Sequence, residues 1–192
     1  MKRLLLALLI GMAVSATTFA DHAQDSLGLG GIFGAGVGWN GRISHPDFYP
    51  ASLSLKIPKV PLFWGLKVWL FNGYDFGLGI TGDYYFAEPN LVSTTTTNDD
   101  GTYQLKIDWY VGVGFYGNMY MGSRLGHHYY GGDGGLRIPF GVSWHAMQQI
   151  KQLEVSVGSV GGVGIGGNKY LDKPYFHLFF IPIEIAVRWW FG

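Results

Sequence analysis

The stretch Ile181-Pro-Ile-Glu-Ile-Ala-Val-Arg-Trp-Trp-Phe191 decides the fold class. Its odd positions are all Ile, Val, Trp or Phe, whereas its even positions include the charged residues Glu184 and Arg188. A period of two predicts a β-strand with one apolar face and one face that carries charges. We expect this strand either to form the edge of a sheet or to pair with the first strand and close a barrel.

The composition of the 192-residue chain limits its class. The formal net charge is zero, from 13 basic and 13 acidic side chains, so the basic footprint of a nucleic-acid-binding protein is absent. Charged residues make up 14%, against roughly 25% in ordinary soluble domains, while glycines number 31 and aromatic residues reach 17%. This balance is typical of membrane barrels. The chain has no cysteine, which excludes disulfides and thiol chemistry.

The first twenty residues predict export. The positive pair Lys2-Arg3 precedes an apolar run over residues 4–14, and Thr18-Phe19-Ala20 offers small residues for cleavage. We therefore expect a Sec-type signal peptide over residues 1–20 and one barrel domain over residues 21–192. The apolar run is too short for a membrane-spanning helix, which needs about 20 residues.

Alternation of apolar residues with polar or small ones recurs along the chain and predicts eight strands. The predicted strands are residues 26–39, 51–57, 62–71, 75–86, 105–115, 136–145, 153–158 and 181–191. The predicted loops, rich in turn-forming residues, are chiefly 40–50, 87–102, 117–133 and 166–174. The short second strand is kept because bacterial single-chain barrels have an even number of strands. We therefore expect an all-β, eight-stranded antiparallel up-and-down transmembrane β-barrel, with residues 87–102 forming a periplasmic turn.

The charged residues indicate which face of the barrel meets lipid. They all fall on the row opposite the large apolar side chains, and that row is otherwise mostly Gly, Ser and Ala, except that Phe63, Trp69 and Phe71 share it in the third strand. A Lys or Arg on the lipid side costs about 2–4 kcal/mol at the midplane, so we expect this row to face the lumen. The predicted lumen charge network is Lys56, Lys67, Asp83, Lys106, Asp108, Arg137, Glu154, Glu184 and Arg188.

We expect these charges to be paired and to fill the lumen, because buried charges are tolerated only when they are paired and hydrogen-bonded. The alternative is that some of them sit in water at the barrel mouths. The opposite row carries Trp and Phe near the predicted strand ends, as expected of girdles at the membrane interfaces. The predicted interfacial aromatics are Trp39, Trp64, Phe86, Phe115, Trp144, Phe179, Trp189 and Phe191.

Four stretches of the chain carry a resemblance to known proteins. They are Ser54-Leu-Lys-Ile-Pro-Lys-Val-Pro-Leu-Phe-Trp-Gly65, Gly82-Asp-Tyr-Tyr85, Asp108-Trp-Tyr-Val-Gly-Val-Gly114 and Leu136-Arg-Ile-Pro-Phe-Gly-Val-Ser-Trp-His145. They resemble a family of small spirochaetal outer-membrane β-barrel proteins, and the architecture is more distantly similar to the eight-stranded outer-membrane protein A, X and W types. The resemblance implies the cell outer membrane as location and insertion by the barrel-assembly machinery, and it implies no activity.

Candidate catalytic and metal-binding residues are few. Ser143 and His145 share the inward row, with Glu154 on the next strand, and some outer-membrane lipid hydrolases and acyltransferases use Ser and His. A His at a strand end is more often a structural, hydrogen-bonded residue. His127-His128, with only Asp133 nearby, makes an incomplete metal site. We therefore expect no catalytic residue, no cofactor and no metal.

Three functional classes remain open. The first, which we favour, is a structural or surface-interaction barrel whose extracellular loops, 40–50, 117–132 and 166–174, contact other molecules. The second is a narrow channel for small or hydrophobic solutes, and the third is a lipid-modifying enzyme. The expected partners are outer-membrane lipid, the barrel-assembly machinery during insertion and an extracellular ligand bound through the loops. The sequence leaves the oligomeric state open.

Overall fold

The computed structural model describes residues 26–39, 44–71, 75–87, 90–98, 101–124, 127–145, 152–168 and 174–191. The predicted signal peptide, residues 1–20, lies outside these ranges. Within them the chain forms nine strands: β1 (Leu27–Trp39), β2 (Ser44–Lys56), β3 (Phe63–Phe71), β4 (Asp75–Ala87), β5 (Asn90–Asn98), β6 (Gly101–Arg124), β7 (His127–His145), β8 (Leu153–Asn168) and β9 (Tyr175–Phe191). The described part of the chain contains no helix that is long and apolar enough to cross a membrane.

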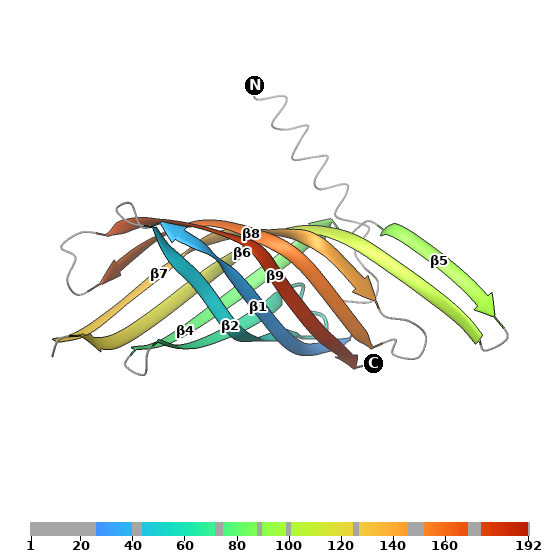
Figure 1. Ribbon diagram of the computed structural model, residues 1–192, viewed down its shortest axis with the longest axis horizontal. Coiled ribbons are helices and arrows are strands. Elements are labelled where there is room, and N and C mark those ends of the chain that lie inside the picture. The colour runs from blue at the N-terminus through green and yellow to red at the C-terminus, as the bar shows by residue number, and fades with distance from the viewer. Residues whose placement is uncertain are drawn as a thin grey trace, which may run out of the picture.

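Eight of the described strands close into a barrel (Figure 1). Each pairs antiparallel with its neighbour in chain order, except that β4 pairs directly with β6 and leaves β5 outside the barrel. The seam is formed by β1 and β9, whose register runs from Leu27↔Phe191 to Trp39↔Leu178. The terminal stretch thus pairs with the first strand, and the predicted closed, antiparallel up-and-down barrel of eight strands is confirmed.

Several segments that the sequence predicts as loops are strands. β2 already begins at Ser44, inside the predicted loop 40–50, and β8 reaches Asn168. β6 and β7 run through most of the predicted connection 117–133 and pair from Gly117↔Gly134 to Arg124↔His127. One of the glycines that suggested a loop makes room for a neighbouring ring. A side chain at Gly131 would place its Cβ 2.6–2.7 Å from the ring and hydroxyl of Tyr120.

The prediction of a loop over residues 87–102 is also wrong. Residues 90–98 form β5, which pairs antiparallel with the beginning of β6. The four consecutive threonines look polar, but threonine is β-branched and favours strands. In Figure 1 this hairpin projects beyond the end of the barrel, on the side where β9 ends.

A bulge divides β9 into two parts. Between Gly158 and Val160 of β8, the partner on β9 moves from Glu184 to Ile181, so β9 carries one extra residue. The same shift occurs against β1 on the other side of the strand. Pro182 lies in this bulge, where its missing N–H does not interrupt a regular ladder.

The bulge reverses which parity of β9 faces inward. Ile181 is 1% exposed and Phe179 is buried, whereas Ile183, just past the bulge, is 56% exposed. The prediction that Phe179 is an interfacial aromatic and that Ile181 belongs to the outward apolar row is therefore wrong. A strict period of two fails wherever one residue is inserted into a strand.

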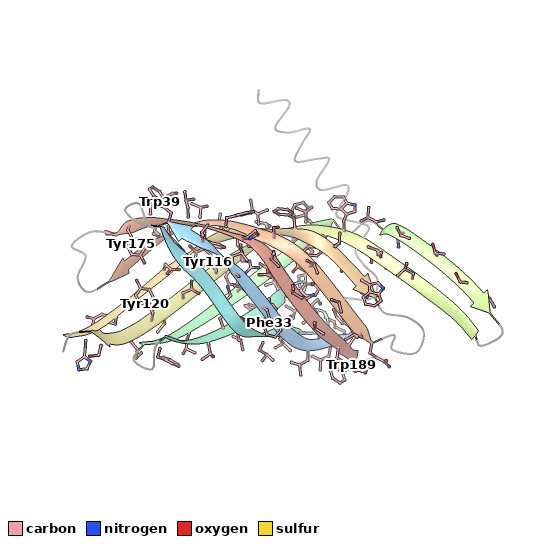
Figure 2. The ribbon with its side chains drawn as sticks, viewed as in Figure 1. Phe33, Trp39, Tyr116, Tyr120, Tyr175 and Trp189 are labelled. Atoms are coloured by element: carbon pink, nitrogen blue, oxygen red, sulfur yellow. The ribbon has the colours of Figure 1, made fainter. Side chains whose placement is uncertain are left out.

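The outer surface of the barrel is apolar around its whole circumference. Exposed large apolar side chains come from every one of the barrel strands and include Leu29, Phe33, Leu53, Leu66, Val68, Leu78, Ile80, Val113, Ile138, Phe140, Val157, Val163, Ile185 and Val187. Eight charged side chains of the strands are buried on the opposite face, inside the barrel: Lys56, Lys67, Asp83, Asp108, Arg137, Glu154, Glu184 and Arg188. Trp39 and Trp189 lie at opposite ends of the barrel (Figure 2).

Candidate functional site: the barrel lumen

Inward-facing side chains form three layers along the lumen. We call the end where β1 begins and β9 ends the terminal end, and the end that holds Trp39 and Tyr175 the far end (Figure 2). Along β9 the buried residues pass from Arg188 and Glu184 through Ile181 to His177. The lumen therefore has a charged layer toward the terminal end, an apolar middle layer and a tyrosine–histidine layer toward the far end.

Arg137 is the centre of the charged layer. Its guanidinium group places Nε 2.9 Å from Asp83 Oδ1 and Nη2 3.1 Å from Glu184 Oε2. The three residues come from β7, β4 and β9, which are not neighbours in the sheet, so the contacts cross the lumen. Arg137 is 1% exposed, and the ammonium group of the buried Lys67 also attracts Asp83.

A second arginine joins strands nearer the terminal end. Arg188 Nη1 donates to Glu154 Oε1 at 2.8 Å, and its Nε donates to Ser54 Oγ at 2.8 Å. The other oxygen of Glu154 accepts from Trp190 Nε1 at 2.8 Å. The guanidinium carbon of Arg188 lies 5.0 Å from the centre of the Phe63 ring. Of the three aromatic residues that the sequence places on the charged row of β3, Phe63 is buried inside the barrel, and the side chains of Trp69 and Phe71 lie outside the described ones.

Lys56 holds the turn between β2 and β3. Its Nζ donates to the carbonyl oxygens of Ile57 at 3.2 Å and Val60 at 2.7 Å, and it lies 5.7 Å from the centre of the Phe63 ring. The turn is closed by a hydrogen bond from Val60 N to Ile57 O at 3.2 Å. Lys59 within it has a φ of 65°, a conformation that normally favours glycine.

Two further predicted lumen charges lie at the terminal mouth. Lys106 Nζ is 3.2 Å from Asp108 Oδ2, and His145 Nε2 is 3.6 Å from the same oxygen. The side chain of Lys106 is 33% exposed, so it reaches water at the mouth. Ser143 is the register partner of Asp108, and Glu154 is the partner of His145 but binds Arg188 instead. The structure thus gives His145 the carboxylate of Asp108 as an ion partner, while the carboxylate of Glu154 binds Arg188.

The middle layer is apolar. It consists of Ile32, Val160, Phe179 and Ile181, which belong to one buried cluster with Tyr116. The Phe179 ring meets the Tyr116 ring edge-on, with centroids 5.0 Å apart. The sequence pattern missed this layer because the bulge in β9 hides two of its members on the wrong parity. The one available signal was Ile32, an apolar exception on a row of glycines.

Toward the far end, the lumen holds a chain of polar side chains. Tyr116 Oη and His177 Nδ1 share a hydrogen bond of 3.0 Å, and Asp133 Oδ1 lies 3.8 Å from the same nitrogen. Asn118 Nδ2 donates to Asp133 Oδ1 at 2.8 Å. Asp133 thus faces His177 rather than the exposed His128. Among the described residues, no three His, Asp or Glu side chains come together as metal ligands would.

Two tyrosines lie beyond this chain at the far end. Tyr120 Oη and Tyr175 Oη share a hydrogen bond of 3.0 Å, and they come from β6 and β9, which β7 and β8 separate in the sheet. Tyr120 and Tyr175 lie near the same end of the barrel as Trp39 (Figure 2). A side chain at Gly166 would meet the Tyr175 ring, so the glycine makes room for it.

The other seven predicted interfacial aromatics are exposed or half-buried. Trp39, Phe115, Trp144, Trp189 and Phe191 are exposed on the outer surface. Trp64 and Phe86 are half-buried, and Trp64 lies edge-on to Phe115 with ring centroids 5.8 Å apart.

The fold and the lumen define a class: a closed eight-stranded barrel with an apolar outer surface and an interior lined by ion-paired and packed side chains. No protein-family model matches the chain, and no curated protein matches it. Among solved structures, the chain is similar to Ail, the attachment invasion locus protein of Yersinia pestis, with 10% identity and a TM-score of 0.35. The similarity covers 85% of this chain and 97% of that chain. At this identity and score it bears on neither function nor partners.

Proposed function

We propose that the protein is an integral outer-membrane barrel with a closed lumen, whose role is structural or lies in contacts made at the cell surface. One observation carries the membrane assignment. Large apolar side chains are exposed around the entire barrel, while eight charged side chains of its strands are buried inside. Apolar patches beyond a few hundred Å² are rare on soluble monomers, and lipid is the solvent that suits this surface.

The orientation follows from the strand count. In outer-membrane barrels with an even number of strands, both chain ends lie on the periplasmic side. The terminal end would then face the periplasm and the far end the outside. Export through the predicted signal peptide and insertion by the barrel-assembly machinery belong to the same proposal, and the resemblance to spirochaetal barrels agrees with it.

The far end supports a role in surface contacts. A strand needs about 9–11 residues to cross a membrane. β3 has 9 residues, whereas β6 has 24 and β7 has 19. The residues of β6 and β7 beyond this length include residues 122–124 and 127–130, which pair at the far end and which we call the far ribbon. Tyr130 in the far ribbon and the neighbouring Met119 and Met121 expose more than half of their surfaces.

The lumen supports a closed barrel rather than a channel. Arg137 binds two carboxylates across it, Arg188 donates across it to Ser54, and Phe179 and Ile181 pack in the middle layer. We also propose that the protein is not an enzyme. Ser143 and His145 face the lumen at the terminal mouth, so the acyl chains around the barrel do not reach them.

The membrane assignment is tested by tryptophan quenching with brominated lipids. Trp189 is exposed on the outer face, whereas its neighbour Trp190 points inward and donates to Glu154. In vesicles of brominated phosphatidylcholine, we expect Trp189→Phe to remove part of the quenched fluorescence and Trp190→Phe to leave that part unchanged. Equal effects of the two variants, or no quenching in the wild type, would contradict a lipid-facing outer surface.

The closed lumen is tested by conductance. We expect the refolded protein in planar bilayers to show no stable openings. Stable, reproducible openings would instead support the narrow channel. A lipid-modifying enzyme would show turnover of bilayer lipid that is lost in Ser143→Ala, and we expect no turnover in either protein.

A further inference from the structure

The hairpin of β5 with the beginning of β6 stands apart from the barrel. β5 is the last strand in the order of the sheet, and within the described residues it pairs with β6 alone. Residues 91–97 are all exposed. In Figure 1 the hairpin extends past the terminal end of the barrel. Among the described strands, none pairs with the other long edge of β5.

This edge lacks the features that usually protect an open strand. Natural edge strands carry charged residues, prolines or bulges that prevent another strand from pairing. β5 has the sequence Asn-Leu-Val-Ser-Thr-Thr-Thr-Thr-Asn, without charge or proline. Its one irregularity lies at Asn90 and Val92, and the register is continuous from Val92 to Asn98.

The register shows which backbone groups face the open edge. Two residues separate the partners Asn98 and Gly101, and in two-residue hairpins the flanking pair exchanges hydrogen bonds. Hydrogen-bonded pairs then alternate along the ladder, so the next ones toward the barrel are Thr96↔Tyr103, Thr94↔Leu105 and Val92↔Ile107. Ser93 and Thr95, between these pairs, turn their N–H and C=O groups away from β6.

We propose that this edge of β5 is a docking edge for an extended segment of a soluble periplasmic polypeptide, which adds to it as a further strand. The periplasmic location rests on the proposed function, whereas the open edge does not. The groups that β5 offers along the edge are evenly spaced backbone donors and acceptors, which only another strand can match in series. Short threonine and serine side chains leave the approach of that strand clear.

A second copy of this chain fits the edge less well. Copies in one membrane are related by a rotation about the membrane normal, which is parallel to the barrel axis. Such a rotation keeps the direction of a strand along that axis, so it cannot bring two β5 strands into antiparallel pairing. Antiparallel pairing is slightly the more stable arrangement. A soluble segment is free to approach in either direction.

The residues of β5 also define the chemistry of the docked segment. Opposite the uncharged residues 91–97, an uncharged strand of β-branched residues is favoured, because such cross-strand pairs stabilise a sheet. Asn98 is followed in the chain by the acidic pair Asp99 and Asp100. A basic residue at the end of the segment that meets this acidic pair gives the docking a direction.

The test uses amide hydrogen exchange, resolved by residue, on the full mature chain in lipid nanodiscs. The probe is the synthetic peptide acetyl-Lys-Thr-Val-Thr-Val-Thr-Val-amide. Without the probe, we expect the amides of Ser93 and Thr95 to exchange fast and that of Thr94 to exchange slowly. With the probe at saturation, the first two should slow about tenfold or more. Slow exchange of Ser93 and Thr95 without the probe, or no change with it, would overturn the proposal.

A matched pair of variants checks that docking uses the backbone. Thr95→Pro removes a donor from the open edge without removing one from the β5–β6 ladder, whereas Thr95→Val keeps that donor. We expect Thr95→Pro to abolish the protection of Ser93 by the probe while Thr94 stays protected, and Thr95→Val to behave like the wild type. Equal protection in both variants would contradict strand addition.

The same samples separate this inference from the proposed function. If the probe fails to dock while brominated lipid still quenches Trp189, the docking edge is wrong and the membrane assignment stands. If the probe docks but the quenching fails, the open edge stands and its periplasmic location is lost. Light scattering of the nanodiscs gives a further check, because a dimer that Thr95→Pro dissociates would assign the edge to a second copy.

Discussion

The charged layer and the middle layer of the same lumen are held together by different physical means. In the charged layer, Arg137 joins Asp83 and Glu184 across the lumen through direct ion pairs. In the middle layer, Phe179 and Ile181 fill the space by packing and make no ion pair. The charged layer therefore depends on each partner being present, because one missing group leaves a buried charge alone. The middle layer depends on volume, so its loss is graded.

The largest effect is expected from removing the central cation. Arg137→Met leaves the carboxylates of Asp83 and Glu184 buried without their common partner. We expect the free energy of unfolding, measured by urea titration in lipid vesicles, to fall by about 3–5 kcal/mol. Adding Asp83→Asn and Glu184→Gln to Arg137→Met should restore most of this loss, because the two buried carboxylates that lost their common partner are then neutral. A loss below about 1 kcal/mol would show that the layer is not dry.

The middle layer is tested by two neighbouring phenylalanines of β9. Phe179 is buried in the lumen, whereas Phe180 is exposed on the outer surface. We expect Phe179→Ala to lower the free energy of unfolding by about 3 kcal/mol, since it leaves a cavity in addition to losing apolar transfer. Phe180→Ala should cost less, because lipid fills the space left behind. Equal losses, measured by the same urea titration, would mean that the bulge at Pro182 does not reverse the faces of β9.

A smaller effect is expected where the middle layer meets the far end. Tyr116→Phe keeps the ring that contacts Phe179 and removes the hydroxyl that shares a hydrogen bond with His177. We expect a loss of about 1 kcal/mol, the usual net contribution of a neutral hydrogen bond. A double-mutant cycle with His177→Phe isolates this pair. A coupling energy of zero in that cycle would rule out the bond.

The smallest effect is a gain at the turn that caps the charged layer. Lys59 has a φ of 65°, and a side chain in that conformation is strained. We expect Lys59→Gly to raise the free energy of unfolding by about 0.5–1 kcal/mol, with Lys59→Ala as the control that keeps the Cβ. The hydrogen bonds of Lys56 to the turn should persist in both variants. No difference between the two variants would mean that the turn has relaxed.

Much of the barrel could be predicted from local patterns. Alternation placed Lys56, Arg137 and Arg188 on an inward row and Leu53, Ile138 and Val187 on an outward one, and the structure places them so. This works because successive side chains of a strand point to opposite faces, whatever the strand pairs with. The same rule failed at Phe179 and Ile181, where one inserted residue changes the parity. It also failed for β5, because turn-like composition outweighed the strand preference of threonine.

The sequence by itself determined the class of fold, the number of barrel strands and the side on which each regular strand carries its charges, since these depend on neighbours in the chain. Only the tertiary structure decided which charges meet, because Arg137 contacts Asp83 and Glu184, which lie 54 and 47 positions away from it in the chain. It also decided that His177 faces Asp133 and that β5 leaves the barrel. Those outcomes depend on closure of the barrel and on the register of its strands, which bring distant residues together.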